Sequence, residues 1–438
     1  MDISPVEKQT GIDLYCTSAP GLGGQLRQEV DDFIVKEISN REEEDSGKQL
    51  ILELTKSNWD MHHLVRDMSR KLGISQKRIS FAGTKDKRAK TTQKISIYDI
   101  DEKDIENFYL KDVELKVLGR SKRSLELGDL FGNEFMITIR NIEHGPEELN
   151  SLLTAITEEI RTYGGVPNFF GIQRFGAIRP VTHLVGEHIL KGDFETAAMI
   201  YIAKSFPDEP DDVKGVRDMI WETRDFAQGL KTYPLRLRYE RAMMHYLVEN
   251  PGDFKGSLSV LASNISKMFV HAYQSYMFNR IVCQRIEKGL PLNAAIPGDI
   301  VCFKNKEGLP DVTKTQQVTE ENVDGMNNLV RRKRAFVTAP LIGYDTEMAS
   351  GETGMIESEV FAETGLPVES FKVLEMPEMA SRGLRREILI HCEPSFKVHE
   401  DELNPGKSKV ILDFTLPKGC YATTVLREYM KVEPLKMS

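Results

Sequence analysis

The stretch FAGTKDKRAKTTQ, residues 81–93, lies between two segments that have the composition of β-strands. One segment, Ile79–Gly83, overlaps the start of the stretch, and the other, Gln93–Ile97, begins at its last residue. β-Branched or aromatic residues recur in both segments. The residues between them are mostly small, polar or basic, which is typical of a loop. The sequence therefore predicts a basic loop between two strands.

Further strands and helices are predicted outward from this loop. DFIVKEI (Asp32–Ile38) and QLILELT (Gln49–Thr55) have strand composition, and the charged run Arg41–Lys48 between them predicts a solvated hairpin loop. Apolar residues recur at helical spacing over residues 61–72. NEFMITIR (Asn133–Arg140) alternates between apolar and polar residues, which predicts another strand.

The middle of the chain has a different pattern. From about Pro180 to Lys333 the apolar residues recur mostly at helical spacing, and Gly343–Thr364 has the composition of a long loop. Strand patterns return at Arg386–Cys392 and Lys409–Leu416, and a last helix follows. We therefore expect an α+β domain that is interrupted by a mostly helical insertion, with the C-terminal strands joining the N-terminal sheet.

Composition excludes several classes of protein. No apolar run approaches the ~18 residues of a transmembrane helix, so we expect no membrane association. The five cysteines lie far apart without a C-x-x-C pair, which argues against a zinc ribbon or a disulfide framework and favours a reducing cytoplasm. No phosphate-binding loop of the Walker type, G-x-S-x-G or H-E-x-x-H motif occurs. We expect a cytoplasmic protein that uses neither a metal nor an organic cofactor.

Positive charge is concentrated around the loop. Residues 61–94 hold ten lysines and arginines against two aspartates, a net charge of +8, whereas the whole chain carries −9. A basic region in an acidic protein indicates an anionic partner that docks there.

Asp86 is a lone carboxylate between the basic residues Lys85, Lys87 and Arg88. Opposite charges stabilise its anion, so we expect it to be ionised at neutral pH. It is either part of an ordinary surface turn with a local ion pair or a functional carboxylate at a site for an anionic ligand. Composition leaves both interpretations open.

The loop resembles the active-site motif of the TruD family of tRNA pseudouridine synthases. Four more segments resemble family motifs and occur in the family's order: GNEF (Gly132–Phe135), VPNFFGIQRFG (Val166–Gly176), HAYQSYMFN (His271–Asn279) and LPKGCYATTVLRE (Leu416–Glu428). Because these segments span most of the chain, the sequence is identified as a member of that family.

The resemblance implies a fold, a reaction and a partner. The fold is α+β: a pseudouridine-synthase-like catalytic domain with a central, mostly antiparallel sheet, residues 1–165 and 378–438, and an inserted, mostly helical TRUD-specific domain, residues 166–377. The reaction is isomerisation of a specific uridine of tRNA, position 13 in bacterial relatives, without a cofactor. We expect tRNA as the partner, no protein partner, and a monomer.

The resemblance also implies roles for individual residues. Asp86 is similar to the family's catalytic aspartate, Phe135 matches the aromatic residue that packs on the target base, and Arg27 falls where bacterial members tend to carry a lysine. The alternatives to binding are structural: a place in the sheet core for Phe135, hydrogen bonds to turn backbone for Asn168 and Gln173, and a surface ion pair for Arg174. The expected substrate-binding residues are Arg27, Lys85, Asn133, Phe135, Asn168, Gln173 and Arg174.

These residue types suit the chemistry. A uridine inside folded RNA must be extruded at a cost of a few kcal/mol, and an aromatic face restores part of the lost stacking. A carboxylate can then act by covalent addition or by removing a proton from the sugar, and the sequence leaves both routes open. Two other hypotheses are a catalytically silent RNA-binding protein and a glycosidic hydrolase, although a retaining hydrolase would need a second carboxylate that is not recognisable here.

Overall fold

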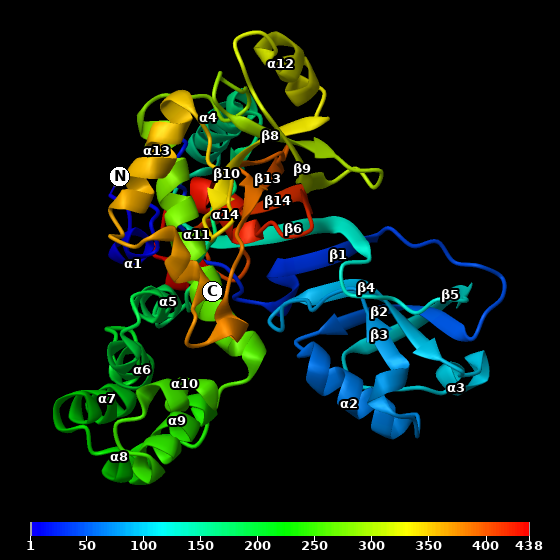
Figure 1. The fold of residues 1–438 in the computed structure, drawn as a ribbon. Coiled ribbons are helices and arrows are strands. Elements are labelled where there is room, and N and C mark those ends of the chain that lie inside the picture. The colour runs from blue at the N-terminus through cyan, green and yellow to red at the C-terminus, as the bar shows by residue number, and fades with distance from the viewer. Residues whose placement is uncertain (1, 438) are drawn as a thin grey trace. The chain divides into compact units, whose positions relative to one another are not determined.

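The structure, a computed structural model, describes residues 2–437 and divides into two compact units (Figure 1). The sheet unit comprises residues 16–166, 304–309 and 390–437. The helical unit comprises residues 2–15, 167–303 and 310–389. Among residues 2–437, no helix is both long and apolar enough to cross a membrane.

The sheet unit is built on one large, mostly antiparallel sheet. In spatial order its strands are β13 (Ser395–Glu400), β14 (Ser408–Pro417), β6 (Leu130–Ile142), β1 (Phe33–Ser39), β4 (Lys90–Tyr98), β2 (Gln49–Ser57) and β5 (Val113–Ser121), and β3 (Ile79–Phe81) pairs with β4 outside this order. β1 and β4 run parallel, whereas the other pairings described in this sheet are antiparallel. The predicted α+β class is confirmed, and the predicted strand Lys409–Leu416 joins the N-terminal sheet as part of β14. The same prediction is wrong for Arg386–Cys392: Leu384–Glu387 joins a separate four-stranded sheet, and Leu389–Ile390 pairs with Val166–Pro167. Strand composition marks a strand but does not show its partner.

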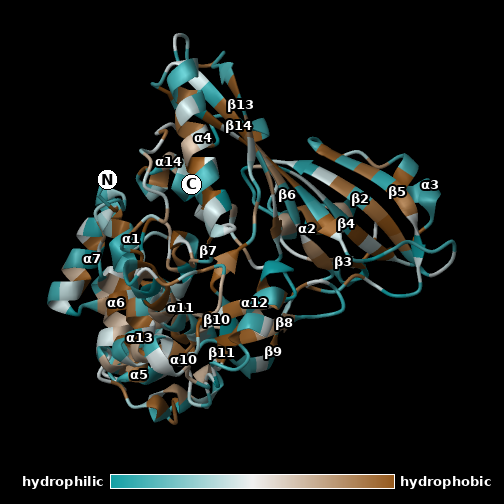
Figure 2. Ribbon diagram, turned by 90° about the horizontal axis from the view of Figure 1, so that it is seen from above, coloured by the Kyte–Doolittle hydropathy of each residue, from teal (hydrophilic) through white to brown (hydrophobic). Residues whose placement is uncertain are grey.

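Helices cover this sheet through two apolar cores. Strands β6 and β14 contribute to one core with α4 (Pro146–Tyr163) and α14 (Ala422–Met430). Strands β2 and β4 contribute to the other with α2 (Met61–Lys71) and the short α3 (Glu102–Glu106). Apolar and polar residues alternate along β2, β4 and β5 (Figure 2), as expected for strands with one buried face.

The helical unit contains a bundle of helices and a smaller sheet. Helices α6 to α10 gather together in Figure 1, and α11 is the longest helix. The helices are α1 (Pro5–Gln9), α5 (Thr182–Leu190), α6 (Phe194–Ala203), α7 (Asp211–Thr223), α8 (Phe226–Thr232), α9 (Arg238–Glu249), α10 (Phe254–Ser259), α11 (Ser263–Glu287), α12 (Val323–Arg331) and α13 (Gly351–Ala362). The sheet has the order β11 (Leu384–Glu387), β10 (Ala335–Leu341), β8 (Ile300–Lys304) and β9 (Pro310–Gln317), and the two-residue strands β7 (Val166–Pro167) and β12 (Leu389–Ile390) span the unit boundaries.

The bounds of the compact units differ from the predicted domains at both ends of the insertion. Residues 2–15 belong to the helical unit, where the Asn279 side chain donates to the Thr10 carbonyl at 2.9 Å. Residues 378–389 also belong to it, and Gln274 of α11 donates to the Ser381 hydroxyl at 2.9 Å. Contacts of this kind between distant segments leave no mark in composition. The assignment of catalytic and inserted domains stays a prediction.

The hairpin predicted around Arg41–Lys48 is wrong. β1 and β2 do not pair, because β4 lies between them, parallel to β1 and antiparallel to β2. The charged run instead reaches past the intervening strand: Glu43 forms an ion pair with Lys94 of β4, and the Glu44 N–H donates to the Arg120 carbonyl of β5 at 2.7 Å. The charge of Glu43, which suggested a solvated loop, therefore helps to hold this segment against the sheet.

The loop predicted over Gly343–Thr364 is also wrong in its second half, which forms helix α13. The helix buries two polar residues, Thr353 and Glu357, together with Ile356 and Val360. Because polar residues and a glycine interrupt its buried face, the apolar spacing of a helix is hidden in the sequence.

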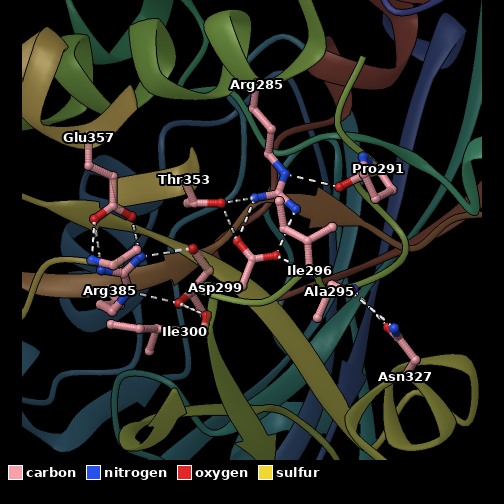
Figure 3. A network of polar contacts seen from close by, with 12 residues as sticks. Arg285, Pro291, Ala295, Ile296, Asp299, Ile300, Asn327, Thr353, Glu357 and Arg385 are labelled. Atoms are coloured by element: carbon pink, nitrogen blue, oxygen red, sulfur yellow. Dashed lines mark hydrogen bonds and ion pairs between the residues drawn. The ribbon is translucent and has the colours of Figure 1, made fainter. Parts of the chain in front are cut away.

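The buried polar face of α13 joins a network of ion pairs (Figure 3). The two Nη atoms of Arg285 donate to the carboxylate of Asp299 at 2.6 and 2.8 Å, and the Thr353 hydroxyl donates to the same carboxylate at 2.8 Å. Arg385 of β11 pairs with Glu357 at 2.5 Å. Since the members are buried and hydrogen-bonded, the network links α11, α13 and the small sheet.

We expect Thr353→Val to lower the free energy of unfolding by about 1–3 kcal/mol, because it removes one partner from the buried Asp299 while keeping the side-chain shape. Urea denaturation measures the difference. Thr223→Val, at an exposed threonine on α7 whose hydroxyl also donates to a helical carbonyl, is the control and should change stability by about 0.5 kcal/mol or less. Equal effects of the two substitutions would contradict a role for the network in stability.

Candidate active site

Asp86 lies in the loop between β3 and β4, and its carboxylate is accessible. Its side chain is 55% exposed, and Oδ2 lies 3.4 Å from Nη2 of Arg27. The two residues are 59 positions apart in the sequence, so the fold of the sheet unit brings them together. The structure thus pairs two of the residues that the sequence singled out.

Arg27 is held more tightly than its partner. Its side chain is 13% exposed, and its guanidinium carbon lies 4.2 Å from the centre of the Phe33 ring, within the range of a cation–π contact. Its Nε atom is buried and has no hydrogen-bond partner among the described residues. Burial lowers the pKa of Arg27 from its ordinary value, and the charge of Asp86 acts in the opposite direction. The guanidinium therefore offers a fixed positive charge to a carboxylate that is open to solvent.

The loop that carries Asp86 is fastened to the sheet on several sides. The Lys85 ammonium forms a buried ion pair with Glu37 of β1 at 2.7 Å. The Gln93 amide donates to the Gly83 carbonyl at 3.0 Å, and the Arg88 guanidinium donates to the Arg27 carbonyl at 3.1 Å. The charge of Lys85 is thus compensated inside the protein, and its contact with substrate stays a prediction.

Lys56 is a residue of this site that the sequence analysis did not identify. It lies on β2, is 0% exposed, and its ammonium group donates to the Asp86 carbonyl at 2.9 Å. A signal was present: Leu50, Leu52 and Leu54 precede it at alternate positions and are fully buried, so the alternation places Lys56 on the buried face. A lysine on such a face needs buried partners.

Phe135 is largely buried in the sheet core. It pairs with Phe414 across β6 and β14, the two rings stack at 5.4 Å, and Phe33 meets Phe135 edge-on at 6.3 Å. The residue is 8% exposed. Phe33 thus contacts both Arg27 and Phe135, which brings Phe135 into the neighbourhood of Asp86. This packing favours the structural alternative for Phe135, and its contact with a base stays a prediction.

Asn133 lies on the same strand, opposite Glu37 of β1. Its side-chain oxygen is buried and has no hydrogen-bond partner among the described residues. An unpaired buried acceptor of this kind suits a role in binding.

Asn168, Gln173 and Arg174 belong to the helical unit, and the structure gives them neighbours there. Asn168 is buried: its amide donates to the Glu387 carbonyl at 2.9 Å, and its oxygen accepts a bond from Arg386 at 2.6 Å. Arg174 donates to the Ser275 hydroxyl at 3.2 Å, and Gln173 is exposed. The place of these three residues in the site stays a prediction.

Comparison with known proteins gives consistent matches over the full length. The sequence model of the family described as tRNA pseudouridine synthase D (TruD) matches residues 9–429. A protein from Methanococcoides burtonii named "Probable tRNA pseudouridine synthase D" is 64% identical over 437 residues, which cover 100% of both chains. A relative of the same name from Archaeoglobus fulgidus is 40% identical over 431 residues, which cover 98% of this chain and 100% of the relative.

A solved structure matches equally well. The crystal structure of a TruD protein from Methanosarcina mazei has a TM-score of 0.93 and 62% sequence identity, and the match covers 100% of both chains. Fold and comparisons together place the chain among the pseudouridine synthases, which are isomerases. Within that class, it belongs to the tRNA pseudouridine synthase D (TruD) family. The family resemblance, and the enzyme class that it implied, are confirmed.

Proposed function

We propose that the protein converts one specific uridine of tRNA, at position 13, into pseudouridine, and that Asp86 carries out the reaction. The observation that carries the proposal is the exposed Asp86 carboxylate, 3.4 Å from the partly buried guanidinium of Arg27, in a loop that resembles the family's active-site motif. Among residues 2–437, no group of three or more His, Cys, Asp or Glu side chains could hold a metal ion.

The reaction needs a group that can act on the sugar or the base while the base is held. The N1–C1′ bond breaks, the uracil turns, the C5–C1′ bond forms, the C5 proton passes to water and N1 takes up a proton. An ionised Asp86 can add covalently or remove a sugar proton. Arg27 balances the charge of the Asp86 carboxylate and orients it through the ion pair. The rest of the carboxylate stays accessible to the substrate, because the Asp86 side chain is 55% exposed.

The proposal also assigns roles to the two domains and names the partner of the protein. We assign catalysis to the domain of residues 1–165 and 378–438, and we assign the inserted domain, residues 166–377, to tRNA binding. A cytoplasmic monomer that needs tRNA as its partner, and neither cofactor nor protein partner, suits the chemistry. Mapping pseudouridines in tRNA from cells with and without the gene tests the proposal. We expect one modified position to disappear, and an unchanged map would refute the proposed function.

The cluster Arg331–Arg334 in the helical unit provides a test of tRNA binding. All four residues are basic and exposed at the end of α12. If each neutralises a phosphate, replacing all four by alanine lowers the slope of log affinity against log salt by about 0.9 for each phosphate that is no longer neutralised. Filter binding of tRNA at several salt concentrations measures the slope. Lys255→Ala is the control, because Lys255 is already paired with Glu375. An unchanged slope in the quadruple variant would make the cluster an ordinary solvated surface.

A further inference from the structure

Lys56 has an unusual place for a lysine. It lies near the end of β2, between Thr91 of β4 and Val113 of β5, and it is 0% exposed. A buried ammonium group is costly unless hydrogen bonds compensate for the lost water. The hydrogen-bond partners of Lys56 therefore indicate why a lysine occupies this buried position.

The partners are two main-chain carbonyls. The Lys56 Nζ atom donates to the Trp59 carbonyl at 2.7 Å and to the Asp86 carbonyl at 2.9 Å. Trp59 precedes helix α2, and Asp86 lies in the exposed loop between β3 and β4. One ammonium group thus ties this loop to a rigid strand at the residue that bears the carboxylate.

The charges around Lys56 are consistent with a buried cation. Asp86 and Asp60 favour the charged ammonium, and Lys85 disfavours it. Burial is the largest effect and lowers the pKa of Lys56 to about 8. Asp86 and Lys85 lie on the loop, and Asp60 caps α2. The buried ammonium is therefore compensated by two carboxylates nearby and by its two hydrogen bonds.

We propose that Lys56 is a positioning residue for the reaction. It fixes the main chain of Asp86, and so the point from which the side chain extends, whereas Arg27 orients the carboxylate at the end of that side chain. This inference rests on the proposed function of Asp86. The Asp86 side chain is mostly exposed, so packing alone does not hold it. A displacement of about 1 Å in a reacting group can cost on the order of 10²-fold in rate.

The test compares tRNA binding with the rate of the chemical step. Lys56→Met removes both hydrogen bonds, and Lys56→Arg keeps donors and charge. Lys431→Met is the matched control, because Lys431 is also buried in the sheet unit and donates to two main-chain carbonyls, those of Thr17 at 2.7 Å and Ala19 at 2.5 Å. Each protein, in excess, is mixed with tRNA tritiated at C5 of uridine. Tritium release is counted per molecule able to bind tRNA, so partial unfolding does not imitate the effect.

We expect Lys56→Met to bind tRNA within about twofold of the wild type and to release tritium on the order of 10²-fold more slowly. Lys56→Arg should recover at least part of the rate, and Lys431→Met should keep the wild-type rate. Release by Lys56→Met at the wild-type rate, or an equal loss in Lys431→Met, would overturn the positioning role. If Lys56→Met binds no tRNA at all, Lys56→Gln, which keeps one shorter donor, takes its place with the same criteria. Absence of release by the wild type would instead refute the proposed function.

Discussion

Asp86→Asn is expected to fold, to bind tRNA and to form no pseudouridine. Asparagine keeps the size and much of the hydrogen bonding of aspartate but lacks the negative charge and the nucleophilic oxygen. We expect the rate to fall by at least about 10³-fold, as when the reacting group of an enzyme is removed. Binding should stay or tighten slightly, because a negative charge leaves a basic surface that faces phosphates.

The measurement is tritium release from tRNA labelled at C5 of uridine. Pseudouridine formation expels the label into water while the base stays attached. A glycosidic hydrolase would release labelled free uracil, and an RNA-binding protein without activity would release nothing. Asp67→Asn is the control: Asp67 lies in the same basic region and is paired with Arg66, so its loss should leave the rate near that of the wild type. Full activity of Asp86→Asn would show that another group performs the chemistry.

Phe135→Ala is expected to lower the free energy of unfolding by about 3–5 kcal/mol. The ring is buried between Phe414 and Phe33, so its removal leaves a cavity where the sheet meets its helices. Urea denaturation measures the loss. Phe131→Ala on the same strand is the control, because Phe131 is more exposed and should cost much less.

The same variant separates packing from base stacking. If Phe135 stacks on the flipped base, the alanine variant loses about 1–3 kcal/mol of stabilisation of that base, and Phe135→Tyr, which keeps the ring face, largely restores it. A loss of activity at unchanged unfolding free energy would contradict the core role that the structure favours.

Much of the sheet unit could be predicted from the sequence because its signals are local. The alternation in Asn133–Arg140 and in Lys409–Leu416 predicted β6 and β14, and the apolar spacing predicted α2. The strand order could not be predicted, because nothing in β1 or β2 shows that β4 pairs between them. Helix α13 was missed because buried polar partners, Asp299 and Arg385, replace apolar contacts on its inner face.

In the candidate site, too, local signals could be predicted from the sequence and contacts between distant segments could not. Asp86 could be predicted because a motif marks it, and Arg27 because it falls where bacterial members tend to carry a lysine; the structure places the two within ion-pair distance. For Lys56 the alternation along β2 could predict burial, but not the hydrogen bond to a carbonyl 30 residues away. Phe135 was marked by its motif, but only the positions of Phe33 and Phe414 show how deeply its ring is packed.

The central position of β4 has a consequence for how the site comes into being. The strands β1 and β2 follow one another along the chain, but they do not pair with each other. They are connected in the sheet only through β4, which comes later in the sequence. Contacts of this kind between distant segments are slow to form, since chain entropy is lost before they stabilise anything. The loop that carries Asp86 leads directly into β4, so we expect the ion pair between Asp86 and Arg27 to form only once β4 is in place between β1 and β2.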